Sequence, residues 1–412
     1  MNLLPFLILI LSMPFGIAFQ CLALVVVSFW ILIKKRHDLK TWRLQVGHQE
    51  SRSIGLILMV AIFQMGATLL NPANPTRDIF SFLMGYLPLI LLPCLFVLMP
   101  KLEANDLARL EKVWTGVMIF WSLLVISQAL KGWHISGIAF ELGDTYRRSQ
   151  GFYSHPLTMA YVALMLWPFH LVLLCTDPRK INRCIMLTSN LLLLYFSASR
   201  TAQAVALLST VGFMFYYFRG RHRWFVLVGL VLAIGGIFST NNTVSRRFMS
   251  MTSHISEEKE SSYPDDRIAF WVVHYIMVKE RPFMGHGINL DKPYRVPYYE
   301  AIGLHNFKKA YEAHNQILQL AAEGGLGAAL AFIFWLGSLH FNWLNGPQAL
   351  KWIRDLTVSC LFFGGLTQNA YFDGEVRYAL MTLMALAFAM GYGRTRAEDT
   401  AASETLIAAP LS

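Results

Sequence analysis

Two arginines and one histidine stand at the edges of apolar stretches, where their side chains could do chemistry. Arg200 lies between two apolar runs, Arg267 opens an apolar and aromatic run, and His314 directly precedes a further apolar run. A guanidinium group binds phosphate oxygens through two parallel hydrogen bonds, so both arginines are candidate phosphate ligands. Histidine titrates near neutral pH, which makes His314 a candidate general base.

Each of these three residues also has an interpretation that needs no chemistry. Arg200 could anchor its segment by extending its charged end to a membrane surface. Arg267 could form a salt bridge with Asp265 or Asp266, which precede it. His314 could be a polar residue at a membrane interface. The residue types alone leave both interpretations open.

Five further residues are supporting candidates for the same site. His286 lies between two glycines, a pattern that indicates a backbone turn. Asp373 separates two apolar runs and could pair with an arginine or with the base. The supporting candidates are Arg147, Arg148, His286, Asn315 and Asp373.

A polar stripe follows His314 along the expected helix. Glu312, Gln316, Gln319 and Glu323 recur at helical spacing and should face the interior of a helical bundle. Glu323 lies about 14 Å from His314 along a helix and half a turn out of phase, so it cannot orient that histidine. The acidic residues are not spaced as a metal-ligand set, and no Cys-x-x-Cys pair occurs. We therefore expect neither a metal nor another cofactor.

The elements that must position these residues are membrane helices. The chain of 412 residues is 55% hydrophobic, and only 15% of its residues are charged, against about 25% in soluble domains. Apolar runs of about 17–25 residues recur along it, which is typical of transmembrane helices, and the alternation of a membrane barrel is absent. The formal net charge of +10 is then better explained by loop residues that set membrane orientation than by nucleic-acid binding.

These runs predict an all-α polytopic membrane protein with about twelve transmembrane helices. Residues 3–33 are too long for one span, so we expect a hairpin that breaks near Pro14 and Gly16. We expect spans one to nine within 1–240, a long loop at 241–314, spans ten to twelve within 315–393, and a disordered tail at 394–412. The other expected spans are 54–70, 79–99, 113–130, 157–175, 184–199, 201–218, 224–239, 315–335, 356–370 and 376–392.

Basic residues set the expected orientation. The loops after the even-numbered spans carry most of the basic residues, such as Lys34, Lys35 and Arg36, whereas the opposite loops carry few. The positive-inside rule then places both termini in the cytoplasm and the long loop in the periplasm. Within that loop, an aspartate before Arg267 can cap a helix whose apolar residues recur at helical spacing. This pattern predicts an amphipathic helix at the membrane surface.

Four segments together resemble the O-antigen ligase and polymerase superfamily, over about residues 145–335. The segment 151–156 also resembles a Gly-x-x-x-Asn-Pro-type segment of these proteins, with His155 in place of the asparagine. The four segments are Arg200 after a span, Asp265-Asp266-Arg267 through Trp271, Arg281-Pro282 through Gly285-His286-Gly287, and the block from His314-Asn315 to Gly327.

The resemblance implies a fold like that of the GT-C glycosyltransferases and a glycosyl transfer on the periplasmic face of the bacterial inner membrane. A glycan would move from undecaprenyl pyrophosphate to lipid A–core without a metal and with inversion at the anomeric carbon. Arg200 and Arg267 match the arginines of the family that hold the pyrophosphate, and His314 matches its essential histidine. Arginines can stabilise the charge of such a leaving group, and histidine suits the role of base.

Three other functions remain open at this stage. An O-antigen polymerase would use the same donor with a second lipid-linked glycan as acceptor. A protein O-oligosaccharyltransferase is less favoured, because those enzymes often carry a large additional C-terminal soluble region that we do not expect here. A transporter of lipid-linked glycans is disfavoured because transporters place polar residues near the membrane midplane, whereas the candidates here gather at one face.

Overall fold

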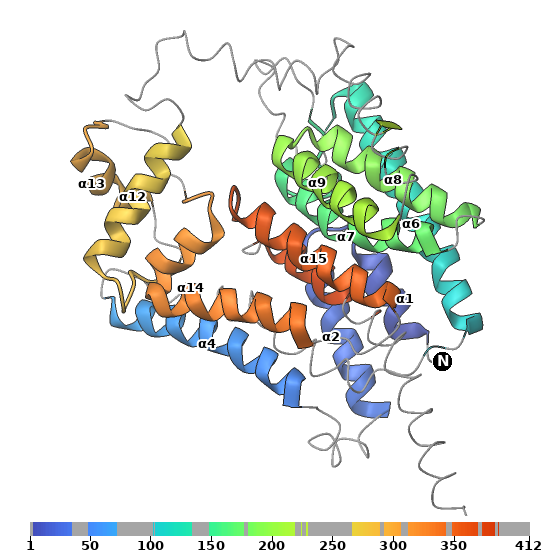
Figure 1. Ribbon diagram of the computed structural model, residues 1–412, viewed down its shortest axis with the longest axis horizontal. Coiled ribbons are helices and arrows are strands. Elements are labelled where there is room, and N and C mark those ends of the chain that lie inside the picture. Colours follow the sequence, from blue (N-terminus) through green and yellow to red (C-terminus); the bar gives the residue numbers. More distant parts are fainter. Residues whose placement is uncertain are drawn as a thin grey trace, which may run out of the picture.

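The part of the chain that the structure describes is helical. The computed structural model describes residues 3–34, 48–71, 104–133, 148–176, 180–218, 266–288, 292–305, 312–342, 348–369 and 373–383, together with 102, 224, 228–229 and 386, and no strand occurs among them. The all-α expectation is therefore confirmed over these residues (Figure 1). The helices are α1 (Leu4–Ser12), α2 (Ile17–Lys34), α4 (His48–Leu70), α6 (Ala104–Lys131), α7 (Pro156–Thr176), α8 (Ile181–Ser197), α9 (Arg200–Tyr217), α12 (Asp266–Glu280), α13 (Lys292–Ala301), α14 (Gln316–Asn342) and α15 (Gln348–Gly365).

The first apolar run forms the expected helical hairpin. Helix α1 ends at Ser12 and α2 begins at Ile17, so the chain breaks across Pro14 and Gly16 as predicted. The amide of Gln20 donates hydrogen bonds of 3.1 and 2.9 Å to two carbonyl oxygens of the turn. A buried side chain of α2 thus satisfies backbone groups that the break leaves without helical partners.

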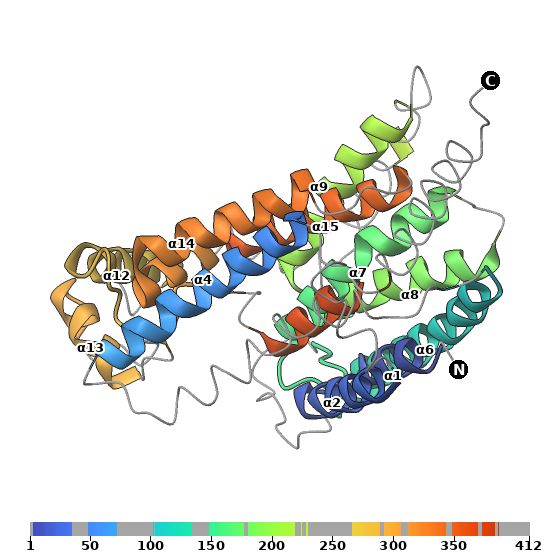
Figure 2. The same cartoon turned by 90° about the horizontal axis from the view of Figure 1, so that it is seen from below.

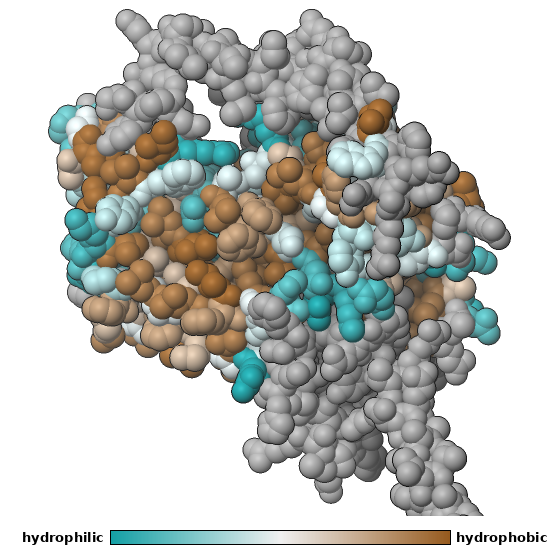
Figure 3. Space-filling model, in the orientation of Figure 1, coloured by the Kyte–Doolittle hydropathy of each residue, from teal (hydrophilic) through white to brown (hydrophobic). Residues whose placement is uncertain are grey.

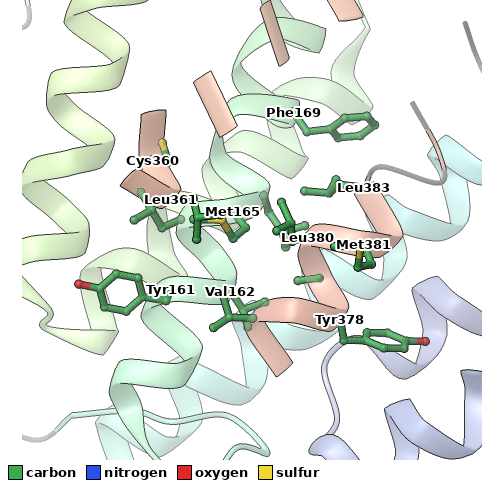
Figure 4. Packing of buried hydrophobic residues seen from close by; sticks show 14 of the residues in the cluster. Tyr161, Val162, Met165, Phe169, Cys360, Leu361, Tyr378, Leu380, Met381 and Leu383 are labelled. Carbon is green, nitrogen blue, oxygen red and sulfur yellow. The ribbon is translucent and has the colours of Figure 1, made fainter. Parts of the chain in front are cut away.

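The helices gather into two groups that meet where α14 contacts α15. Helices α6, α7, α8, α9 and α15 pack together, and α14 lies along α4 with α12 and α13 beside its first turns (Figures 1 and 2). Residues 374–383 add a helical segment to the first group. Its Tyr378, Leu380 and Met381 lie near Val162 and Met165 of α7 in the hydrophobic core (Figure 4).

Several helices have the composition of membrane spans. Among the described residues, four helical stretches are long and apolar enough to cross a membrane, namely 17–34, 105–131, 156–176 and 316–340, and the apolar part of α4, residues 55–70, is shorter. Helices α8, α9 and α15 follow three other expected spans in position. The expected span at 79–99 and nearly all of the one at 224–239 lie outside the described residues, so the total of twelve stays a prediction.

Several helices extend beyond the apolar runs from which their spans were predicted. Helix α4 begins at His48 and α6 at Ala104, both within segments expected to be polar loops, and α14 continues to Asn342. Helix α15 begins earlier than expected, at Gln348, and ends at Gly365, before the expected end of its span at 370. The polar turns are stabilised by neighbouring side chains, because Glu111 of α6 pairs with Arg183 at 3.3 Å and Asp355 of α15 accepts a 2.7 Å hydrogen bond from its neighbour Arg354. Hydropathy reports membrane contact and not the full length of a helix, which explains the difference.

Apolar side chains cover the outward face formed by α4 and α14 (Figure 3). Met59 and Ile62 of α4 are exposed, as are Leu330 and Phe334 of α14. A contiguous apolar surface of this kind is what a helix presents to lipid. We therefore regard this face as membrane-facing.

Candidate active site

His314 stands directly before α14 and is held from two sides. Its Nδ1 atom lies 2.9 Å from the side-chain Oε1 atom of Gln368, in the segment that follows α15. Its ring lies against that of Phe270 on α12, with ring centroids 5.5 Å apart. The backbone φ of His314 is 47°, in the left-handed region that residues other than glycine rarely adopt. Such strained backbone is found preferentially at functional sites.

The surroundings keep the imidazole of His314 in its neutral form. Burial is the main cause that lowers the pKa of His314, and the nearby Arg267 lowers it further, while the contact with Gln368 and the charge of Glu312 act in the opposite direction. The net shift is downward, so the ring is neutral at neutral pH. A neutral imidazole can accept a proton, as a general base must.

Asn315 supports this histidine by fixing the start of α14. Its Oδ1 atom accepts a 3.0 Å hydrogen bond from the backbone N–H of Leu318, which is the geometry of a helix N-cap. Its Nδ2 atom donates to the carbonyl oxygen of Leu366 beyond the end of α15. Asn315 therefore joins the two segments that carry His314 and Gln368.

Arg267 lies in the first turn of α12, and the structure confirms that a helix begins there. The side chain is half-buried and lies close enough to His314 to influence its titration. The positive charge of Arg267 therefore acts on the candidate base from the start of α12.

Arg200 is the first residue of α9, at a sharp turn between two helices. Ala198 ends α8 in the left-handed conformation, and Ser199 caps α9 by accepting a 3.4 Å hydrogen bond from the N–H of Ala202. Arg200 itself is exposed. A helix N-terminus also favours an anion.

Arg148 and His155 lie at the same end of the bundle. The Nε atom of Arg148 donates a 3.1 Å hydrogen bond to the carbonyl oxygen of Ser197 at the end of α8. The Nδ1 atom of His155 accepts from the N–H of Leu157, so this histidine caps α7. Burial, followed by the charges of Arg148 and His314, lowers the pKa of His155 to about 4. Arg147, the other arginine of this pair, lies outside the described residues.

Asp373 is also at this end, where it contacts α7. Its Oδ2 atom accepts a 3.0 Å hydrogen bond from the hydroxyl of Thr158. Burial is the main cause that raises the pKa of Asp373 to about 7, and the charge of Glu375 adds to it. The carboxyl group can therefore bind a proton within the physiological range.

A buried polar cluster lies behind the histidine and contains Gln319 and Glu323 of the predicted stripe. Glu312 was expected to face the interior with them, but it precedes the helix and is exposed. The carboxylate of Glu323 accepts hydrogen bonds of 2.7 Å from Gln64 and 2.6 Å from Gln319. Gln319 also accepts a bond from the N–H of Ala313, directly before the histidine. A cavity of about 10 Å³, room for roughly one water molecule, adjoins the cluster. It is lined by His274, Met277, Arg295, Glu312, Gln319, Ala322 and Glu323.

The side chain of His286 has a structural role, because it holds its turn against neighbouring helices. Its Nδ1 atom lies 2.9 Å from the hydroxyl of Tyr294, and its Nε2 atom lies 2.9 Å from the carbonyl oxygen of Met277. Both ring nitrogens thus have partners, and the side chain is buried. His286 anchors its turn to α12 and α13, whereas the ring of His314 is only half-buried.

The turn around His286 interlocks with a kink in α14, and we call this arrangement the glycine contact (residues 282–287 against 322–326). The N–H of Leu326 bonds to the carbonyl oxygen of Pro282 at 2.7 Å, while the N–H groups of His286 and Gly287 bond to carbonyl oxygens of α14. Gly325 has φ 76° and ψ 176° inside the helix. Only glycine readily adopts that conformation, so the glycine-rich sequences on both sides serve the fold.

Sequence reasoning missed two residues that the structure brings to His314. Gln368 and Phe270 contact it directly. Phe270 had a local signal, since it lies one helical turn after Asp266. Gln368 had none, because its partner is distant in the chain. Within the described residues, no group of three or more His, Cys, Asp or Glu side chains could hold a metal ion.

Comparison with known proteins agrees with the resemblance noted in the sequence. Residues 185–333 match the family model described as O-antigen ligase. This stretch runs from α8 to α14 and contains Arg200, Arg267 and His314. A search of curated proteins found no match.

Proposed function

We propose that this chain, which belongs to the O-antigen ligase family through residues 185–333, is an O-antigen ligase. It would transfer an O-antigen glycan from undecaprenyl pyrophosphate to lipid A–core on the periplasmic face of the bacterial inner membrane. The family supports a ligase or polymerase type of reaction between a lipid-linked glycan and a lipid-anchored acceptor, and the specific donor and acceptor are our proposal.

One structural observation supports this proposal in addition to the family match. The pKa of the half-buried His314 is lowered by burial and by the charge of Arg267, and His314 lies at the end of the bundle where α9 begins with Arg200. If His314 is the base, the base and these cationic groups would lie next to helices that have the composition of membrane spans. Such an arrangement suits a donor whose lipid stays in the bilayer while its pyrophosphate lies at the surface.

The reaction would proceed by a single displacement. The hydroxyl oxygen of the acceptor sugar attacks the anomeric carbon of the donor, and its proton passes to His314. The bond between that carbon and the pyrophosphate oxygen breaks, and the pyrophosphate leaves with the bonding electron pair. Arg200 and Arg267 would stabilise the charge on the leaving group, as a metal would in other enzymes. Attack opposite the leaving group inverts the anomeric centre.

The test is the glycolipid content of a deletion strain complemented with the wild-type gene or with His314→Ala. A ligase deletion should leave long glycans on undecaprenyl pyrophosphate and lipopolysaccharide that lacks O-antigen. The wild-type gene, but not the variant, should restore full-length lipopolysaccharide. Single repeat units on the carrier would instead indicate a polymerase, and an unchanged glycolipid pattern would refute both.

A further inference from the structure

The contact between His314 and Gln368 has a defined polarity. An amide oxygen such as Gln368 Oε1 can only accept a hydrogen bond. The Nδ1 atom of His314, 2.9 Å away, must therefore carry the proton. In a neutral imidazole the Nε2 atom then holds the lone pair. The contact thus selects the tautomer in which Nε2 is the atom able to take a proton from a substrate.

The segment that carries Gln368 is fixed on both sides of this residue. The carbonyl oxygen of Leu366 accepts the hydrogen bond from Asn315 at 3.1 Å. The Nδ2 atom of Asn369 donates to Glu312 at 3.0 Å and lies 3.4 Å from Gln319. These bonds join the end of α15 to the start of α14, so the amide of Gln368 meets the imidazole without further rearrangement.

We propose that Gln368 is a positioning residue that holds His314 with Nε2 as the basic atom during glycosyl transfer. This inference rests on the function proposed above, and it adds a residue that lies outside the segment matched by the family. Bases in other enzymes are likewise oriented by a third group that bonds to the second ring nitrogen. Here that group is a neutral amide, which fixes the tautomer with less effect on basicity than a carboxylate would have.

Charged and titratable groups from several elements face His314. Together with Gln368 they influence the pKa of its imidazole. Arg267 and His274 lie on α12, Arg295 lies on α13, and Glu312 lies two residues before His314. His155 faces it from the segment before α7. Replacing the amide of Gln368 by a carboxylate adds one negative charge in direct contact with Nδ1. An opposite charge at such a distance raises the pKa of a histidine by about 1–3 units.

The first experiment measures the pH dependence of transfer by the purified full-length protein from an undecaprenyl-pyrophosphate-linked glycan to lipid A–core. Gln368→Glu should move the acid limb of kcat/KM to higher pH by about one unit or more. Ser154→Glu is the matched control, because Ser154 is exposed and its neighbour His155 lies at the same end of the bundle. The control should leave the acid limb in place. An unmoved limb for Gln368→Glu would overturn the inference.

The second experiment separates positioning from general stability. Gln368→Leu keeps the size of the side chain and removes the hydrogen bond, so kcat should fall roughly 10–100-fold, as when imidazole loses an orienting partner, with the donor KM nearly unchanged. In a His314→Ala background the same change should cost nothing further. An equal loss in both backgrounds would show that Gln368 acts on the fold. Absence of transfer by the wild-type protein would instead refute the proposed function itself.

Discussion

The rings of Phe270 and His314 are in tilted contact at a centroid distance of 5.5 Å, although Phe270 lies in the first turns of α12 and His314 precedes α14. Phe270 is buried, and its ring also meets that of Tyr299 on α13 edge-on. One aromatic side chain therefore connects the candidate base to both helices of the long loop. The orientation of the imidazole depends on this packing as well as on Gln368.

Shortening this side chain should reduce turnover more than it reduces expression. Phe270→Leu removes the aromatic contact with His314 and part of the buried side chain, and we expect a loss of about 1–2 kcal/mol in stability together with a clear drop in kcat. Phe283→Leu is the matched control, because the side chain of Phe283 is 77% exposed. Thermal unfolding in detergent and transfer kinetics are the measurements. Equal kcat for the two variants would contradict the role given to Phe270.

Removing the imidazole should abolish most of the transfer. His314→Ala should lower kcat by about 10²–10⁴-fold, the usual contribution of a general base, while donor binding is retained. Because burial lowers the pKa of His314, the wild-type rate should stay level through neutral pH. It should fall only below the ordinary histidine range near pH 6.5. Kinetics from about pH 4.5 to 8 test this, and near-full activity of His314→Gln would count against a base.

The two arginines should not tolerate replacement by lysine. Arg200→Lys and Arg267→Lys keep the charge but lose the two parallel hydrogen bonds of the guanidinium group. We expect both variants to lose most transfer activity, with Ala at least as severe. Arg183→Lys is the matched control, since Arg183 pairs with Glu111 at the other end of α8. Full activity of Arg267→Ala at normal expression would remove Arg267 from the site.

The glycine contact should be intolerant of even one methyl group. At Gly325 a Cβ atom would fall on the carbonyl oxygen of Phe283, and the backbone conformation excludes other residues. Gly325→Ala should cost well over about 1 kcal/mol of stability. Gly116→Ala in α6, where a Cβ meets nothing within 4 Å, should be neutral or stabilise by about 0.5–1 kcal/mol. Thermal unfolding compares the two, and equal midpoints would contradict the assigned constraint.

The orientation inferred from loop charges can be tested without kinetics. Reporter fusions at Ser256, in the expected periplasmic loop, and at Ala402, in the expected cytoplasmic tail, should give signals from opposite sides of the membrane. Both positions lie outside the described residues. Signals from the same side would rule out the twelve-span arrangement.

The sequence by itself determined the local elements of this protein. The break between α1 and α2, the start of α12 beside Asp266 and the turn before Arg200 all lie where apolar runs, turn residues and capping residues predicted them. The physical reason is that these features depend on backbone preferences and on contacts between near neighbours, which a local pattern records. The polar stripe toward Glu323 was predictable for the same reason.

Only the tertiary structure decided what surrounds His314. Gln368 lies 54 positions away, and nothing in its own segment marks it as a partner. Its contact depends on how α14 and α15 pack, and packing is decided by the fit of many side chains at once. The constraint on Gly325 is of the same kind, because it comes from the carbonyl groups of a distant turn. Local patterns specify which helices form, and the folded arrangement specifies which side chains meet.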